Sequence, residues 1–188
     1  MSTKYKATVP GEAYFITITV VNWIDLFTRI NQKQIIVNSL IYCQKEKGLE
    51  IFAWCLMPSH LHMLCRGSEN EPLSDIMRDF KKFTSKKIIQ SIKEEPESRR
   101  EWLLEQFSKA CESLKREQKY KVWQDGYHAE ILKTNGFIYQ KLNYVHNNPV
   151  EDGIVVRPEE YMYSSARNYA DLDGLFDVIV LPPVVKTF

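Results

Sequence analysis

Residues 49–66 read LEIFAWCLMPSHLHMLCR, and this stretch limits how the rest of the chain can be arranged. Residues 49–57 and 60–66 are two short, largely apolar runs, and runs of this length and composition predict β-strands. Pro58 and Ser59 separate them, because a proline cannot donate its backbone nitrogen to a sheet. The stretch therefore predicts two consecutive strands.

Regular elements are predicted on both sides of this stretch. Upstream, residues 14–22 (YFITITVVN) are rich in β-branched and aromatic side chains and predict a strand. A helical period over residues 31–47 stops at Gly48. Downstream, we predict helices over 72–93, 102–117 and 135–148, a strand over 127–132, and an irregular aromatic tail.

This order, β-α-β-β-α-(α)-β-α, predicts an α+β protein with a ferredoxin-like βαββαβ core and an antiparallel sheet. The additions are an inserted helix at about 97–118 and an extra C-terminal helix, which ends before Pro149. The 188 residues are enough for a single domain over 1–188, with its core at about 14–163. Ferredoxin-like folds have many functions, so the fold alone does not assign one.

Charge is distributed unevenly along the chain. The formal net charge is only +1, so the total gives no argument for nucleic acid. Between residues 78 and 93, however, six basic residues face one acid, Asp79, which predicts a basic helix face. A solvated surface is the ordinary explanation for such a run, and contact with phosphates is the alternative. The six are Arg78, Lys81, Lys82, Lys86, Lys87 and Lys93.

Several classes of protein are disfavoured by the sequence. Its four cysteines form no CxxC pair, which argues against a zinc knuckle or a redox motif. The first residues contain no apolar signal-peptide core, and no run of about 18 apolar residues predicts a membrane span. We therefore expect a cytoplasmic protein without membrane contact.

Two histidines, His60 and His62, lie at the start of the strand predicted over 60–66. Side chains alternate along a strand, so the two imidazoles should lie side by side, with Leu61 directed the other way. Imidazole nitrogens suit divalent transition ions and also accept Mg²⁺ or Mn²⁺ when phosphate oxygens complete the shell. A chance pair of surface histidines is the alternative.

Tyr144 and Asn148 lie four residues apart in the helix predicted over 135–148. At 3.6 residues per turn they share a helical face, so a phenol and an amide carbonyl point the same way. A core tyrosine and a helix-ending asparagine would show the same spacing. His146 projects about 200° away from Tyr144 and is not assigned to this face.

Together, MPSHLHMLC (57–65) and YVHNNPV (144–150) resemble the two signatures of the REP-associated tyrosine transposases. These belong to the single-tyrosine HUH transposases, with the 200/605 group of insertion sequences. VWQDGYHAEIL (122–132) resembles the family's WQ-containing stretch, and FKKFTSKK (80–87) resembles its basic helix. The resemblance covers residues from about 14 to 163.

The resemblance implies a set of roles. His60 and His62 match the pair that holds a divalent ion, Mg²⁺ or Mn²⁺, and Asn148 matches the third, polar ligand. Tyr144 matches the nucleophile that cuts single-stranded or hairpin DNA through a 5′-phosphotyrosine, and a homodimer is implied. The expected DNA contacts are Arg78, Lys81, Lys82, Lys86 and Lys87 on phosphates, with Trp123, Gln124 and Tyr127 near bases. Packing in the core or at a strand edge is the alternative for Trp123 and Tyr127, and it is favoured for Trp123.

Three other interpretations fit parts of the sequence. An HUH replication initiator or relaxase would nick DNA without transposing it. A catalytically silent nucleic-acid-binding module would use the same fold, although such modules carry aromatic residues where this strand carries histidines. A structural zinc protein is disfavoured by the absence of paired cysteines.

Overall fold

The computed structural model describes residues 7, 9–112 and 118–182. It confirms the predicted order of a βαββαβ core with an inserted helix and an extra C-terminal helix. No helix in this described part of the chain is both long and apolar enough to cross a bilayer. The main elements are β1 (Ala13–Thr19), α1 (Ile30–Lys47), β2 (Glu50–Leu56), β3 (His60–Arg66), α2 (Leu73–Glu94), α3 (Arg100–Lys109), β4 (His128–Ile131), α4 (Asn135–Glu151) and α5 (Ala166–Tyr169).

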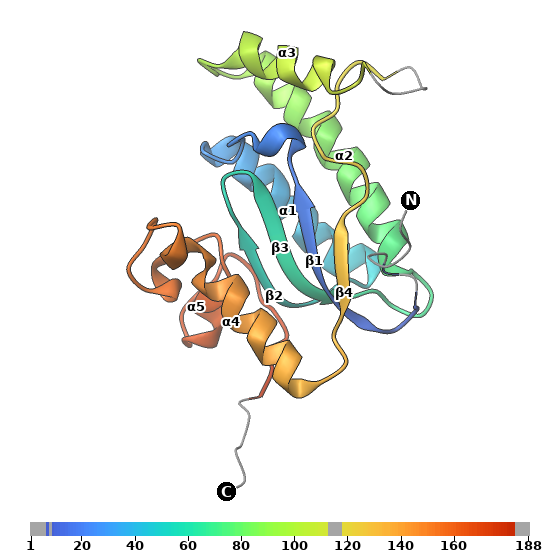
Figure 1. The fold of residues 1–188 in the computed structure, drawn as a ribbon, viewed down its shortest axis with the longest axis vertical. Helices are drawn as coiled ribbons and strands as arrows, with labels where there is room; N and C mark the ends of the chain where they lie inside the picture. The colour runs from blue at the N-terminus through green and yellow to red at the C-terminus, as the bar shows by residue number, and fades with distance from the viewer. Residues whose placement is uncertain (1–6, 8, 113–117, 183–188) are drawn as a thin grey trace, which may run out of the picture.

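The four strands form one sheet in the order β2-β3-β1-β4, and all neighbouring strands are antiparallel. This is the sheet predicted from the order of the elements. Helices α1 and α2 lie behind the sheet in Figure 1, whereas α4 and α5 lie on its other side, near β2. The site described below lies on the α4 side.

Alternation along the strands gives the sheet two different faces. On the α1/α2 face, Ile16 and Met63 belong to the large buried core. On the opposite face, Phe15 and Leu64 form a smaller cluster with Leu142 and other side chains of α4. Because α4 packs on β2 and β3, the β1 and β4 side of this face borders an open pocket instead.

The segment after β1 departs from the prediction. β1 ends at Thr19, whereas the strand was predicted to continue to residue 22, and Val21–Trp23 form a 3₁₀ helix instead. Asn22 and Trp23 have φ angles of 55° and 54°, in the left-handed region that ends strand pairing. A pattern of β-branched residues does not predict a left-handed turn at this place.

Helix boundaries also differ. α3 covers Arg100–Lys109 rather than residues 102–117, of which 113–117 lie outside the described residues. α4 continues through Pro149 to Glu151, so the predicted end before the proline is wrong. Pro149 lies in the last turn, where its missing N–H removes only one helical bond, and Asp152 N still donates to Asn148 O at 3.0 Å. The tail, predicted to be irregular, contains a 3₁₀ helix (Pro158–Glu160) and α5.

Candidate active site

His60 and His62 lie next to each other on the α4 face of β3. Their ring centroids are 4.5 Å apart, whereas Leu61 between them is buried in the core on the other face. The strand alternation predicted from the sequence therefore places the two imidazoles together. His62 is almost fully buried, at 3% exposed, and His60 is half-buried.

Thr17 fixes the orientation of the His62 ring. β1 and β3 pair Thr17 with His62, and Thr17 Oγ1 lies 2.8 Å from His62 Nδ1. The other nitrogen, Nε2, is buried and finds no hydrogen-bond partner among the described residues. Burial, with the positive charge of Lys141 and the effect of His60, lowers the pKa of His62 to about 3, so the imidazole is neutral at physiological pH. A neutral ring whose Nδ1 proton points at Thr17 leaves the Nε2 lone pair available.

His60 is also biased toward its neutral form. Burial lowers the pKa of His60, while Asp152 and a side-chain hydrogen bond with Asn148 act in the opposite direction. Ser59 Oγ lies 3.0 Å from His60 Nδ1. The contact with Asn148 connects the histidine pair to α4.

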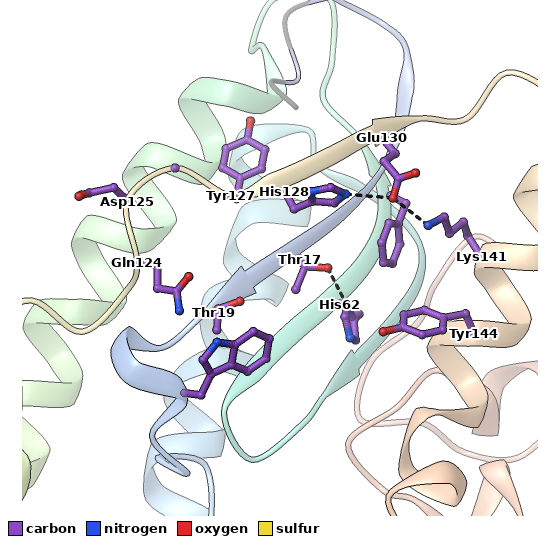
Figure 2. Close-up of a pocket in the computed structure, with 13 residues that line it drawn as sticks. Thr17, Thr19, His62, Gln124, Asp125, Tyr127, His128, Glu130, Lys141 and Tyr144 are labelled. Atoms are coloured by element: carbon purple, nitrogen blue, oxygen red, sulfur yellow. Dashed lines mark hydrogen bonds and ion pairs between the residues drawn. The ribbon is translucent and has the colours of Figure 1, made fainter. Parts of the chain in front are cut away.

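Tyr144 faces the histidine pair from α4 of the same chain. Its ring centroid lies 5.1 Å from that of His62 and 5.8 Å from that of Phe15. Figure 2 shows the Tyr144 hydroxyl directed toward His62. The tyrosine is 41% exposed, whereas Asn148, one turn further along the helix, is buried. The helical spacing predicted from the sequence therefore brings an accessible phenol and a buried amide to one site.

The back of α4 is fastened to β2 by the C-terminal segment. Ser165 Oγ lies 2.9 Å from His146 Nε2 and accepts a hydrogen bond from Trp54 N at 2.9 Å. The Tyr161 hydroxyl donates to Leu56 O at 2.8 Å. Burial lowers the pKa of His146 to about 4. His146 thus positions the helix from the side opposite Tyr144, as its angle on the helix predicted.

The residues present fit a divalent cation. Two neutral imidazoles and an amide are suitable ligands, and none of the residues that the structure describes hydrogen-bonds the buried Nε2 of His62. Within the described part of the chain, no cluster of three His, Cys, Asp or Glu side chains could hold a metal. The Asn148 amide, which hydrogen-bonds the His60 side chain, is the candidate third ligand.

An open pocket of about 740 Å³ extends from Tyr144 and His62 toward β4. It contains a polar chain that the sequence did not predict: Lys141 Nζ lies 2.8 Å from Glu130 Oε1, which lies 3.0 Å from His128 Nε2. The three side chains and these contacts are visible in Figure 2. Lys141 precedes Tyr144 by one helical turn, and this spacing was the only sequence signal for it.

A basic groove of about 890 Å³ adjoins the pocket and shares residues 124–127 with it. Among the predicted DNA contacts, Lys87 does not border either cavity. Lys119 and Lys121, which the prediction missed, do border the groove. The predicted contacts that border it are Arg78, Lys81, Lys82, Lys86, Trp123, Gln124 and Tyr127.

Two of these residues have a different role from the one predicted. Trp123 is only 3% exposed, and its Nε1 donates to Thr84 Oγ1 at 2.9 Å in the core, so its ring offers no face to a base. Lys81 Nζ donates to Gln124 O at 2.7 Å and to Gly126 O. Burial lowers the pKa of Lys81 to about 8. Lys81 thus holds the loop between the two cavities rather than projecting freely toward phosphates.

Comparison with known proteins assigns the chain to a transposase family. The sequence matches the model of the IS200-like transposases over residues 14–148, and the chain belongs to that family, as the resemblance predicted. It is similar in fold to the structure of a REP-associated tyrosine transposase bound to a REP hairpin, with 20% identity and a TM-score of 0.62 over 99% of this chain and 100% of that one. A putative transposase from Deinococcus radiodurans R1 is more distant, with 17% identity and a TM-score of 0.42 over 78% and 97%. No curated protein sequence matched.

Proposed function

We propose that this transposase cuts and rejoins single-stranded or hairpin DNA with Tyr144 as nucleophile and a divalent cation held by His60, His62 and Asn148. The observation that carries the proposal is the 5.1 Å separation of the Tyr144 and His62 rings within one chain. The family supports DNA as the substrate. The hairpin bound by the structural relative supports a hairpin as the first substrate to test.

The reaction is a transesterification. Tyr144 Oη forms a bond to phosphorus while the bond from phosphorus to the 3′ oxygen breaks, which leaves a 5′-phosphotyrosine and a free 3′-hydroxyl. The phenol proton is lost to solvent and the departing oxygen gains one, so protons balance. Attack by a DNA 3′-hydroxyl on the phosphotyrosine reverses the step, and no nucleotide cofactor is consumed.

The chain's own residues orient the reactants. The neutral imidazoles of His60 and His62 and the Asn148 amide would hold Mg²⁺ or Mn²⁺, which neutralises phosphate charge when bound. Tyr144 is exposed enough for a flexible strand to approach it. A free phenol has a pKa of about 10, so only about one molecule in a thousand is ionised at pH 7. Loss of the proton is therefore a demanding part of the step.

The test is covalent trapping. Purified protein is incubated with a panel of single-stranded hairpins and Mn²⁺, and denaturing gels with mass spectrometry locate any adduct. We expect an adduct on Tyr144 that is lost in Tyr144→Phe and retained in Tyr139→Phe, a matched change on the same helix. An adduct that persists in Tyr144→Phe would assign the nucleophile elsewhere.

The same experiment separates a silent binding module, which retains DNA and gives no adduct. A replication-type nickase gives the same adduct, and a transposition assay distinguishes it because it does not move a DNA segment to a new site. Chelation of the metal should abolish the adduct. A homodimer and a cytoplasmic location belong to the proposal, but the chemistry needs neither, since the four residues proposed for it lie close together in one chain.

A further inference from the structure

Trp23 is held in a strained backbone conformation that exposes its side chain. Its φ of 54° follows one of 55° at Asn22, and left-handed φ angles cost free energy in residues other than glycine. The neighbours on both sides are anchored, because Val21 and Ile24 are buried. Val21 N also donates to Val122 O at 2.8 Å. The anchored turn leaves Trp23 60% exposed, although an indole is a favourable group to bury.

The exposed indole lies beside the candidate metal ligands. Its ring centroid is 5.4 Å from that of His60, with an angle of 72° between the planes. The two rings are therefore not stacked on one another. Trp23 also borders the pocket into which Tyr144 and His62 open. A flat aromatic surface is thus available directly next to the place where a scissile phosphate would lie.

Polar groups that suit a nucleobase edge lie in the same pocket. Gln124 N donates to Thr19 O at 2.9 Å, which ties the 124–127 loop to the end of β1. Figure 2 shows the side chains of Gln124 and Thr19 together beside the end of β1. Gln124 Nε2 donates to Val20 O at 3.4 Å, so the amide has its second N–H and its oxygen to offer a base edge. With the Thr19 hydroxyl, this wall suits the edge of a nucleobase.

The basic groove indicates what kind of molecule reaches this pocket. Residues 124–127 form a wall shared by the two cavities, so a strand bound along the groove passes over them to reach Tyr144. Lys82 and Lys86 are exposed on the groove side and suit backbone phosphates. A positively charged groove for the phosphates, together with an exposed aromatic ring for the bases, is the combination that binds single-stranded nucleic acid.

We propose that Trp23 stacks on the nucleobase next to the cleaved linkage and thereby fixes which phosphate meets Tyr144. This proposal rests on the proposed function, because it assumes that single-stranded DNA occupies the pocket. The base is unpaired when bound, since an indole can cover its face only if it has left a duplex stack. Stacking on an indole accepts any base. A preference for particular bases would come from hydrogen bonds between the base edge and the adjacent Gln124 side chain.

Binding experiments test the stacking. All variants also carry Tyr144→Phe and are measured in chelator by fluorescence anisotropy, so that cleavage plays no part. An abasic residue is moved one position at a time across the cleavage region of a single-stranded oligonucleotide. We expect one position at which the abasic residue weakens binding by about 5- to 150-fold, and this penalty should disappear in Trp23→Ala.

Tryptophan fluorescence gives a second readout with an internal control. Trp102 is also exposed, at 46%, but it lies on α3 and borders neither cavity, whereas Trp54 and Trp123 are buried. Adding DNA should quench the tryptophan fluorescence of the Trp102→Phe protein. The same quenching should be absent in Trp23→Phe. An abasic penalty that is unchanged in Trp23→Ala, or quenching that is lost only in Trp102→Phe, overturns the proposal. A missing phosphotyrosyl adduct instead counts against the proposed nuclease function, so the two failures are distinguishable.

Discussion

His62 has two ring nitrogens, and Thr17 determines which of them is free. The Thr17 hydroxyl occupies Nδ1, and the described residues offer Nε2 no hydrogen-bond partner. A hydrogen bond to the other ring nitrogen sets the tautomer of a metal-binding histidine and increases its basicity. A hydroxyl on β1 is therefore as much a part of the site as the histidine that it orients.

Thr17→Val removes this hydrogen bond while keeping the shape of the side chain. We expect Mn²⁺ affinity to fall by about 10- to 100-fold, because the ring is no longer fixed with Nε2 exposed to the ion. Isothermal titration calorimetry with Mn²⁺ in the absence of DNA measures this directly. Thr17→Ser, which keeps the hydroxyl, should restore most of the affinity. Equal affinity in all three proteins would show that Thr17 does not act through His62.

The sequence predicts residues whose partners lie close by in the chain. His60 and His62 share a strand face, and Tyr144 and Asn148 share a helix face, so spacing alone pairs them correctly. Thr17 reaches the site through strand pairing over 45 residues, a register that its sequence position does not reveal. Trp23 depends on a left-handed turn, for which the sequence gives no glycine signal.

At the scale of elements, β4 and α4 are connected through one carboxylate. Glu130 on β4 bonds Lys141 on α4, which also lies 4.4 Å from the centre of the Phe15 ring. His128 on β4 contacts the same carboxylate. This connection joins the strand at the open edge of the pocket to the helix that presents Tyr144.

Glu130→Gln should weaken this connection in a pH-dependent way. Burial raises the pKa of Glu130, but the bonds from Lys141 and His128 outweigh it and place the pKa below its ordinary value. A depressed carboxyl pKa contributes stability above the unfolded value of about 4.3, and this contribution is lost as the pH falls through the folded value. We expect the substitution to lower the free energy of unfolding by up to about 1 kcal/mol at pH 7.

Urea unfolding at pH 7 and at a pH below the folded pKa of Glu130 measures the difference in free energy of unfolding between the two proteins. The difference should be present at pH 7 and should shrink as the pH falls through that folded pKa, because the wild-type carboxylate then becomes protonated. Glu46→Gln, at an exposed position on α1, is the control and should show no such change. A difference of the same size at both pH values would mean that the charge of Glu130 is not what stabilises the connection.

Periodicity predicted the elements better than their ends. The apolar runs of β2 and β3 and the amphipathic α2 follow from local patterns and are confirmed. The ends of α4 and β1 were wrong because tertiary contacts decide them. Val21 is held by Val122 from a distant segment, and the last turn of α4 continues past Pro149 into the packed C-terminal segment.

At the scale of the whole molecule, all the residues of the proposed site, Tyr144, His60, His62 and Asn148, lie close together within one chain. The C-terminal segment fastens α4 to β2, and this fixes Tyr144 over the histidines of its own sheet. We therefore expect Tyr144→Phe mixed with His60→Ala to give no phosphotyrosyl adduct, measured by the gel assay. Mixtures of each variant with wild-type protein are the control, because they show whether a variant inhibits adduct formation by another chain. An adduct in the mixture of the two variants would show that partner chains exchange their tyrosine helices.

The net charge is only +1, so the positive charge of the basic groove is local. The contribution of each lysine of α2 to DNA affinity therefore depends on whether it lies on the groove face of the helix. Lys82 borders the groove, whereas Lys87 on the same helix is exposed but borders neither cavity. In a plot of log affinity against log salt concentration, each phosphate contact to a single strand makes the slope steeper by about 0.7. Lys82→Ala should therefore flatten the slope between 50 and 200 mM salt by about that amount, while Lys87→Ala leaves it unchanged. Anisotropy titrations in chelator measure both, and equal slopes for the two variants would mean that DNA does not follow the groove.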